Sequence, residues 1–288
     1  MLNSNDSLKD ILLLLSRGKS TVIDYKRRLT DFFPSVTLFV DMGIKERRTK
    51  ILAILFLLSD LDFQTVRFDE KVQQIFDLSF NQKTKGTISA LLREGYIEAG
   101  EGERVYKLTD KGYQEFALEV PFIRFLKDSW DGKWRVLSYE IPEKKRELRD
   151  RLRRQVSGWG LGPWHRSFWL TPHPIIENLM ELIHGKEEEV YVQAFEADHV
   201  VGDREVLIEK VWGKAELEKK YRELFKTWHL ILSQDLEKHE KLKKVSTEYL
   251  GLLRQDPGLP KELVGQGWIG FEAFNIYKEI RAILLTQS

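Results

Sequence analysis

Apolar positions in the first half of the chain recur at helical spacing in three successive segments. The third segment reads as a helix over residues 81–93, because Asn81 can cap its first turn and Gly95 can end it. Asp69 is a comparable N-cap for the second segment. The spacing and the caps together predict three helices in this region.

Two short strands are expected directly after the third helix, at residues 96–98 and 104–109. The turn between them contains two glycines, which is typical of a β-hairpin. A further helix is expected to begin after Thr109. Three helices followed by a β-hairpin form a winged helix-turn-helix, which is the architecture predicted for residues 46–128.

The central part of the chain alternates between strand and helix patterns. Its clearest helix places Leu148, Leu152 and Val156 on one face. The expected elements are a strand at 134–141, a helix at 143–156, strands at 159–163 and 167–171, a helix at 175–184 and a strand at 189–195. This βαββαβ order predicts a ferredoxin-like domain over residues 129–203. A second copy of the chain could cover the open sheet of such a domain.

The pattern becomes mainly helical after residue 203. A short strand is expected at 205–211, and two long helical stripes of apolar side chains follow it. We therefore expect a C-terminal helical domain over residues 204–288. Residues 1–45 carry weaker helical stripes and are expected to form an N-terminal helical extension. The fold class predicted for the whole chain is α+β.

Composition narrows the possible functions. The 288 residues include 46 Lys and Arg against 45 Asp and Glu, so any basic surface has to be local. The absence of cysteine excludes disulfides and thiolate metal sites. The apolar segments are too short to span a membrane and the first residues do not resemble a signal peptide, which predicts a cytoplasmic protein with no membrane partner. No P-loop, dinucleotide-binding or HExxH motif occurs, and no cofactor is expected.

The helix expected at residues 81–93 has the composition of a DNA-reading helix, with three basic residues and no acid. Lysines neutralise phosphates, and short polar side chains can hydrogen-bond to base edges in the major groove. The candidate DNA-binding residues are Gln82, Lys83, Lys85, Thr87 and Ser89 of this helix and Arg104 of the hairpin. The hairpin also carries three glutamates, which would repel phosphate. A winged helix that binds only protein therefore remains an alternative.

A second basic helix, at residues 143–156, is open to several interpretations. Its Lys and Arg residues could contact DNA or hold an anionic ligand. They could also form ion pairs on a solvated face, such as Glu147–Arg151 and Asp150–Arg154. Residues 26–28 of the extension are likewise basic, and could be either an arm that touches DNA or the solvated side of a packed segment.

Several short segments resemble a family of bacterial transcriptional repressors. They are Trp130-Asp131-Gly132-Lys133-Trp134, Ile141-Pro142-Glu143, Gly158-Trp159-Gly160, Trp169-Leu170-Thr171-Pro172, Asp256-Pro257-Gly258-Leu259-Pro260 and Trp268-Ile269-Gly270. In this order they resemble the central and C-terminal domains of the PaaX family, best known for the control of phenylacetic acid catabolism. The segment LLREGYIEAGEGERVYKLTDKG is similar to the winged helix of that family. The resemblance covers residues 47–288.

The resemblance implies a non-enzymatic transcriptional regulator. We expect a homodimeric repressor that binds an inverted repeat in double-stranded DNA, one half-site for each winged helix. The resemblance also suggests release by an acyl-coenzyme A effector, whose phosphates the helix at 143–156 could hold. No effector-binding residue follows from it.

The central domain also looks like the dimer-forming subunit of the CRISPR spacer-acquisition machinery. There the first strand ends in a Tyr-Asp pair, and the aspartates of a dimer can hold a divalent metal. The corresponding pair here is Tyr139-Glu140, so a metal-dependent nuclease using Glu140 is an alternative function. No second acid or histidine is spaced to complete such a site, and no metal is expected. A scaffold that does not bind DNA is the third possibility.

Overall fold

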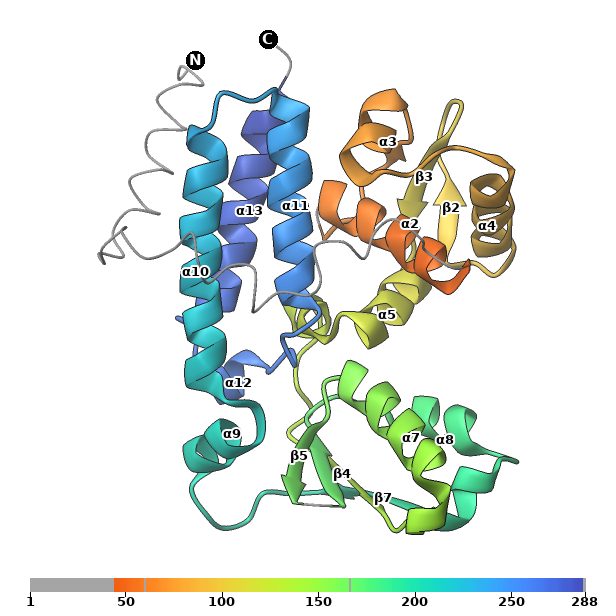
Figure 1. Ribbon diagram of the computed structural model, residues 1–288, viewed down its shortest axis with the longest axis vertical. Helices are drawn as coiled ribbons and strands as arrows, with labels where there is room; N and C mark the ends of the chain where they lie inside the picture. The colour runs from red at the N-terminus through yellow and green to blue at the C-terminus, as the bar shows by residue number, and fades with distance from the viewer. Residues whose placement is uncertain (1–43, 60, 166, 287–288) are drawn as a thin grey trace. The chain divides into compact units, whose positions relative to one another are not determined.

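A computed structural model (Figure 1) describes residues 44–286, except residues 60 and 166. Residues 1–43 of the expected N-terminal extension, including the basic segment at residues 26–28, lie outside the described residues. The described chain combines α-helices with two antiparallel sheets, which confirms the α+β class. It divides into two compact units. Unit 1 contains the residues up to 113, 224–247 and those from 276, and unit 2 contains 114–223 and 248–275.

Unit 1 contains three helices and a small sheet close together in the sequence. The helices are α2 (Ile44–Leu58), α3 (Glu70–Phe76) and α4 (Gln82–Arg93). The strands are β1 (Val66–Arg67), β2 (Ile97–Ala99) and β3 (Val105–Leu108), in the order β1-β3-β2. The hairpin β2–β3 lies where the glycine-containing turn predicts it. The sequence pattern did not predict β1, which pairs Val66 with Tyr106.

The predicted N-caps of α3 and α4 are both present. The Asp69 carboxylate accepts a hydrogen bond from the N–H of Val72, and the Asn81 side chain accepts one from the N–H of Thr84, each at 3.0 Å. Each bond satisfies a backbone donor that the first turn of a helix leaves without a partner. The buried residues of α4 are Thr84, Ile88 and Leu91. The helix therefore turns its remaining side chains outward.

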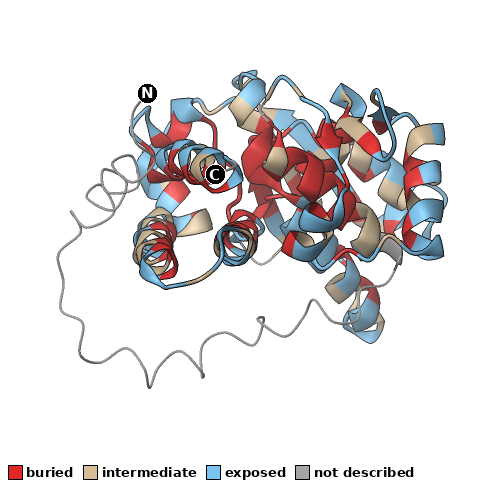
Figure 2. Ribbon diagram, turned by 90° about the horizontal axis from the view of Figure 1, so that it is seen from above, coloured by how far each residue is buried: buried red, intermediate tan, exposed pale blue. Residues whose placement is uncertain are grey.

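Unit 1 also includes stretches of three long helices from the C-terminal part of the chain. These are α10 (Lys214–Ser233), α11 (Lys238–Leu253) and α13 (Ile269–Leu285). Their buried residues lie on the inner sides (Figure 2). Trp228 of α10 is fully buried. The Lys243 ammonium contacts the Asp77 carboxylate at 2.7 Å, and the Arg281 guanidinium donates to the Leu57 carbonyl at 3.2 Å. These contacts fasten α2 and the end of α3 to the long helices.

Unit 2 contains a four-stranded sheet with two helices. Its elements are β4 (Trp134–Tyr139), α7 (Arg146–Gly158), β5 (Gly162–His165), β6 (Phe168–Thr171), α8 (Ile176–Ile183) and β7 (Val192–Ala197). They follow the predicted βαββαβ order, and the strands are arranged β5-β6-β4-β7. β4 is therefore an inner strand, paired antiparallel with β6 on one side and with β7 on the other.

The two faces of this sheet differ in their burial. Leu137 and Tyr139 of β4 contribute to a core that includes the apolar face of α7 and Leu179 of α8. The opposite face carries Phe168 and Phe195, which are 41% and 55% exposed. The helices α7 and α8 thus cover one face, while the other buries Trp134 and Leu170 but retains exposed aromatic side chains at Phe168 and Phe195.

Two of the strands expected in this part of the chain are revised. Residues 205–211 form helix α9 (Arg204–Trp212), not a strand. The Asp203 side chain caps it by accepting the N–H of Val206 at 3.1 Å, and Gly213 ends it with a left-handed φ of 62°. The strand expected from residue 189 begins only at β7, because the 3-10 turn η3 (Glu187–Tyr191) precedes it.

Five short helical elements in the described chain link the helices and strands given above. They are α5 (Asp110–Glu119), η1 (Pro121–Ile123), α6 (Arg124–Lys127), η2 (Glu143–Lys145) and α12 (Lys261–Val264). Within unit 2, the turn before α12 is held by buried polar groups. The His173 ring donates from Nε2 to the Pro257 carbonyl at 2.7 Å, and the Tyr221 hydroxyl donates to Asp256 at 2.6 Å.

Burial shifts the pKa values of His173 and Asp256, the two side chains that bond to this turn or belong to it. Together with the nearby Arg124, it lowers the pKa of His173 to about 3, so the ring is neutral at neutral pH. Burial raises the pKa of Asp256 to about 6. The interior of unit 2 therefore contains an uncharged histidine that acts as a hydrogen-bond donor to a distant turn.

Candidate nucleic-acid interface

Helix α4 presents the predicted DNA-binding side chains on its outer side. Gln82, Lys83, Lys85 and Ser89 are exposed, and Thr87 is half-buried. The Thr87 hydroxyl donates to the Lys83 carbonyl within the helix at 2.9 Å. Its oxygen can therefore still accept a hydrogen bond, but its proton is already engaged.

The cations of α4 have no carboxylate partner. Lys83, Lys85 and Arg93 form no ion pair with any described residue, and the helix contains no acid. Glu94, the first acid after the helix, is bound to Arg48 at 2.6 Å. The positive charge of α4 is therefore not neutralised by the part of the protein that the structure describes.

Phe80, which the sequence reasoning did not single out, connects α4 to the hairpin. The Lys85 ammonium lies 5.9 Å from the centroid of its ring, and the Arg104 guanidinium lies 4.7 Å from it. A cation over an aromatic face is attracted by about 0.5–1 kcal/mol at an exposed site. The ring therefore brings together two of the predicted DNA-binding residues from different elements. An aromatic residue directly before the Asn81 cap was the available signal.

Arg104 occupies an uncommon backbone conformation at the start of the returning strand. Its φ is 57°, in the left-handed region, and its carbonyl accepts the N–H of Phe68 at 2.9 Å. The side chain is 41% exposed and lies 3.2 Å from Glu103. The backbone bond fixes the hairpin to the segment that leads into α3. No described contact joins Gln82 or Ser89 to Arg104.

Two of the three hairpin glutamates have a cation beside them. Glu98 pairs with Lys107 at 2.9 Å, and Glu103 lies beside Arg104. Paired carboxylates project less negative charge toward a nearby polyanion than free ones do. The acidic composition of the hairpin therefore opposes DNA binding less than the sequence suggests.

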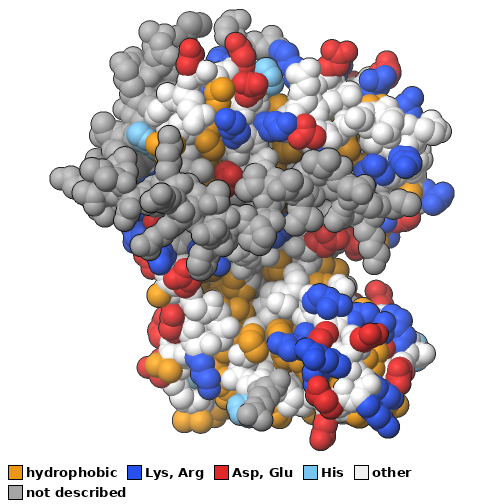
Figure 3. Space-filling model, in the orientation of Figure 1, with side chains coloured by type: hydrophobic (Ala, Val, Ile, Leu, Met, Phe, Trp, Pro, Cys, Tyr) orange, Lys and Arg blue, Asp and Glu red, His pale blue; other side chains and the backbone are white. Residues whose placement is uncertain are grey.

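The second basic helix, α7, is organised differently. Three cations in α7 or directly before it form ion pairs with acids other than those predicted four residues away. Lys145 is bound by Glu187, Arg149 by Glu143 and Arg151 by Glu188. The predicted pairs Glu147–Arg151 and Asp150–Arg154 are not formed, and Asp150 instead lies 3.5 Å from Arg146. The acids at 187 and 188 belong to η3, which is distant in sequence and close in space. Basic and acidic side chains are consequently interspersed over α7 (Figure 3).

Glu140, the carboxylate of the alternative nuclease function, lies directly after β4 and is exposed. Its N–H donates to the Tyr191 carbonyl at 3.0 Å. Within the described ranges, no group of three or more His, Asp or Glu side chains is arranged to hold a metal ion. None of the described helices combines the length and apolar character needed to cross a membrane.

Two parts of the chain match known protein families. Residues 127–207 match the PaaX protein central Cas2-like domain, and residues 212–288 match the PaaX-like protein C-terminal domain. Among solved structures, the uncharacterized protein Rv0674 from Mycobacterium tuberculosis is similar to this chain at 16% identity and a TM-score of 0.49. The similarity covers 83% of this chain and 95% of that one. No curated protein matches.

The two family matches are consecutive and together cover more than half of the 288 residues. They include the Trp130–Trp134 segment and the Asp256–Pro260 turn, on which the resemblance in sequence rests. Members of this family are transcriptional regulators. The chain belongs to the PaaX family.

Proposed function

We propose that this PaaX-family chain is a DNA-binding transcriptional repressor in which residues 46–128 form a winged helix. Family membership supports a role in transcription regulation. The observation that carries the proposal is the outer side of α4, whose cations have no carboxylate partner among the described residues. In this proposal the remaining domains extend over residues 129–203 and 204–288, and α4 enters the major groove.

Each proposed contact has a separate chemical role. Lys83 and Lys85 neutralise phosphates, while Gln82 and Ser89 offer exposed hydrogen-bonding groups to base edges. Arg104 and Lys85 both lie close to the Phe80 ring, which suits a phosphate close to both elements. The α4 helix thereby supplies positioning contacts as well as side chains able to distinguish bases.

We further propose that the repressor is a homodimer. The exposed face of the unit 2 sheet, with Phe168 and Phe195, is the surface that a second copy would cover. Two winged helices would then bind the half-sites of an inverted repeat. Sedimentation of the wild-type chain and of Phe195→Ser tests this step. A dimer that becomes a monomer in the variant supports it, and a wild-type monomer at micromolar concentration contradicts it.

An acyl-coenzyme A thioester is the proposed effector, by analogy with the family. An effector releases DNA only if it binds the DNA-incompetent arrangement more tightly, and it shifts the equilibrium only by that difference in affinity. Adding an acyl-coenzyme A to a preformed complex with DNA tests this step. An unchanged affinity for DNA would exclude that thioester as the effector.

Gel-shift measurements with genomic fragments test DNA binding itself. We expect a few fragments to bind selectively and the double variant Lys83→Ala plus Lys85→Ala to lose that binding. Lys144→Ala is a control, since it removes an exposed cation outside α4. Equal affinity for every fragment, unaltered by the double variant, would refute the proposal.

A further inference from the structure

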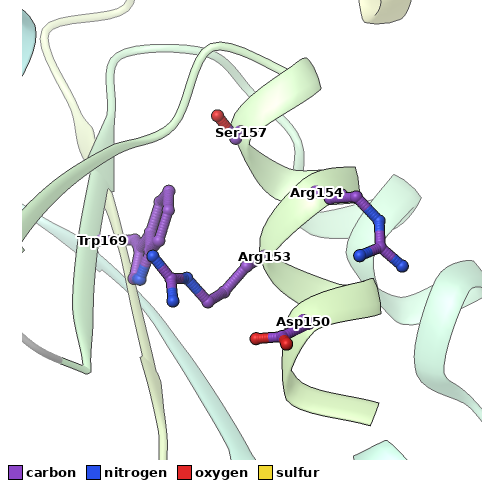
Figure 4. Close-up of a pocket in the computed structure, with 5 residues that line it drawn as sticks. All are labelled: Asp150, Arg153, Arg154, Ser157 and Trp169. Carbon is purple, nitrogen blue, oxygen red and sulfur yellow. The ribbon is translucent and has the colours of Figure 1, made fainter. Parts of the chain in front are cut away.

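A pocket of about 420 Å³ opens between α7 and β6 in unit 2 (Figure 4). It is lined by Asp150, Arg153, Arg154, Ser157 and Trp169. The first four lie at helical spacing along one side of α7, and the indole comes from the sheet. The volume is within the range of small-molecule sites, which is roughly 300–1,000 Å³.

The polar groups that line the pocket are mostly donors without acceptors. The Arg153 guanidinium lies 6.0 Å from the centroid of the Trp169 ring and points toward it in Figure 4, whereas the Arg154 side chain points away from the ring. Neither arginine forms an ion pair with a described residue, and the Ser157 hydroxyl has no hydrogen-bond partner among them. A ligand would therefore meet unused donors.

A buried donor beside the pocket also has no acceptor. Arg149, one turn before Arg153, is bound to Glu143 at 2.6 Å through Nη1, but its buried Nε makes no hydrogen bond with a described residue and lies 3.8 Å from the Asp150 carboxylate. Leaving a buried donor unsatisfied is unfavourable. Burial raises the pKa of the Tyr139 hydroxyl, while the hydrogen bond from Trp169 and the charges of Arg153 and Arg149 act to lower it.

The Trp169 side chain, which forms the floor of the pocket, is held in place by a hydrogen bond. The Trp169 indole N–H donates to the Tyr139 hydroxyl at 3.1 Å, and both side chains are buried. Asp150 is the only acid in the lining, and it lies 3.5 Å from Arg146 and 3.8 Å from Arg149. Because other cations already oppose its charge, Asp150 does not neutralise Arg153 or Arg154. The local balance favours an anion.

We propose that this pocket binds a small molecule through a phosphate or carboxylate group, held by Arg153 and Ser157 above Trp169. A guanidinium fork matches the paired oxygens of either group. The bound anion would supply acceptors for donors that the protein leaves unused. The proposal concerns unit 2 alone and does not depend on DNA binding by α4.

The Trp169 side-chain N–H is a direct reporter, since its hydrogen bond forms the floor of the pocket. Its signal in a proton–nitrogen NMR spectrum of the full chain can be assigned from the peak that disappears in Trp169→Phe. Inorganic phosphate, phenyl phosphate and benzoate are then titrated separately at constant ionic strength. We expect a saturable shift with at least one of them. Tighter binding of phenyl phosphate would identify phosphate as the preferred group, and tighter binding of benzoate would identify carboxylate.

Three variants assign the binding to this pocket. Arg153→Gln should weaken binding about tenfold or more, because it removes a charged hydrogen-bond donor. Arg153→Lys should weaken it less, since it keeps the charge and loses the fork. Lys144→Gln, which removes an exposed cation from η2 outside the pocket, should leave it unchanged.

Three results would overturn the proposal. The first is the absence of a saturable Trp169 shift with all three compounds. The second is a titration of Arg153→Gln identical to that of the wild type. The third is a Trp169 shift produced only by a DNA duplex and abolished in Arg153→Gln, which would make the pocket a phosphate contact for DNA. A melting temperature close to wild type confirms that the variants are folded.

Discussion

Helices α4 and α7 are both rich in lysine and arginine, yet only α4 leaves every cation without a carboxylate. The acids that bind the α7 region come from η3, from the turn before the helix and from the helix itself, as in Arg151–Glu188, Arg149–Glu143 and Arg146–Asp150. No acid reaches Lys83 or Lys85 within the described residues. The number of basic residues on a helix therefore does not identify an interface. What identifies it is whether the rest of the fold has already supplied the opposite charge.

The largest expected effect tests this contrast through salt dependence. Removing Lys83 and Lys85 together should lower affinity for specific DNA about a hundredfold and reduce the slope of log K against log salt by about 1.8. Lys144→Ala plus Arg146→Ala removes the same charge near α7 and should change neither quantity. Fluorescence anisotropy at several salt concentrations measures both. If the two double variants behave alike, the contrast between the helices has no functional meaning.

The second effect concerns folding. Arg151→Ala leaves the Glu188 carboxylate, whose side chain is 7% exposed, without its cation. An unsatisfied group of this kind costs about 1–3 kcal/mol, so the free energy of unfolding should fall by about that amount. Lys83→Ala, with no carboxylate partner to lose, should stay within about 0.5 kcal/mol of wild type. Urea denaturation distinguishes these outcomes, and equal losses would contradict the assignment of paired and unpaired cations.

The third effect uses two exposed glycines, Gly86 in α4 and Gly158 in α7. A methyl group added at either would meet no atom within 4 Å. Gly86→Ala should stabilise the protein by about 0.5–1 kcal/mol, because glycine disfavours the helix interior. If the α4 backbone approaches DNA closely, the same variant should bind DNA more weakly although it is more stable. Gly158→Ala is the matched control and should not affect DNA binding, as thermal melts and anisotropy can show.

The smallest effect is in pH dependence. Burial raises the pKa of Glu188, but the hydrogen bond from Arg151, a backbone hydrogen bond and the charges of Arg151 and Lys186 together hold the pKa below the ordinary value of 4.5. The pair therefore contributes stability above about that pH and loses it as the pH falls through the lower, folded-state pKa. Arg151→Ala should reduce this acid-dependent loss, while His173 contributes equally to both proteins. The difference between their stabilities from pH 6 to pH 3 should shrink, and a constant difference would contradict this linkage.

Sequence reasoning succeeded where structure depends on neighbours along the chain. The caps at Asp69 and Asn81, the apolar face of α7 and the βαββαβ order are all local patterns. It failed at residues 205–211, where the pattern predicts a strand and the chain forms helix α9. There the Asp203 side chain caps the first turn of a helix and Gly213, in the left-handed conformation, ends it.

The missed features of the candidate sites are contacts between distant segments. Phe80 and Arg104 are far apart in sequence and meet only in the folded unit. The same is true of Arg151 and Glu188, where the pattern instead predicted a partner four residues away. Side-chain type and spacing along a helix carry no information about acids or rings that arrive from other elements.

The division of the chain into two units has a consequence for how it is made. Unit 2 requires residues 248–275, and unit 1 requires residues from 276 onward. The hydrogen bond from the His173 ring to the Pro257 carbonyl cannot form until the ribosome has added 84 more residues. Neither unit therefore has all its residues until late in translation, and the apolar side chains that pack against these last segments have no partner there until the segments are made.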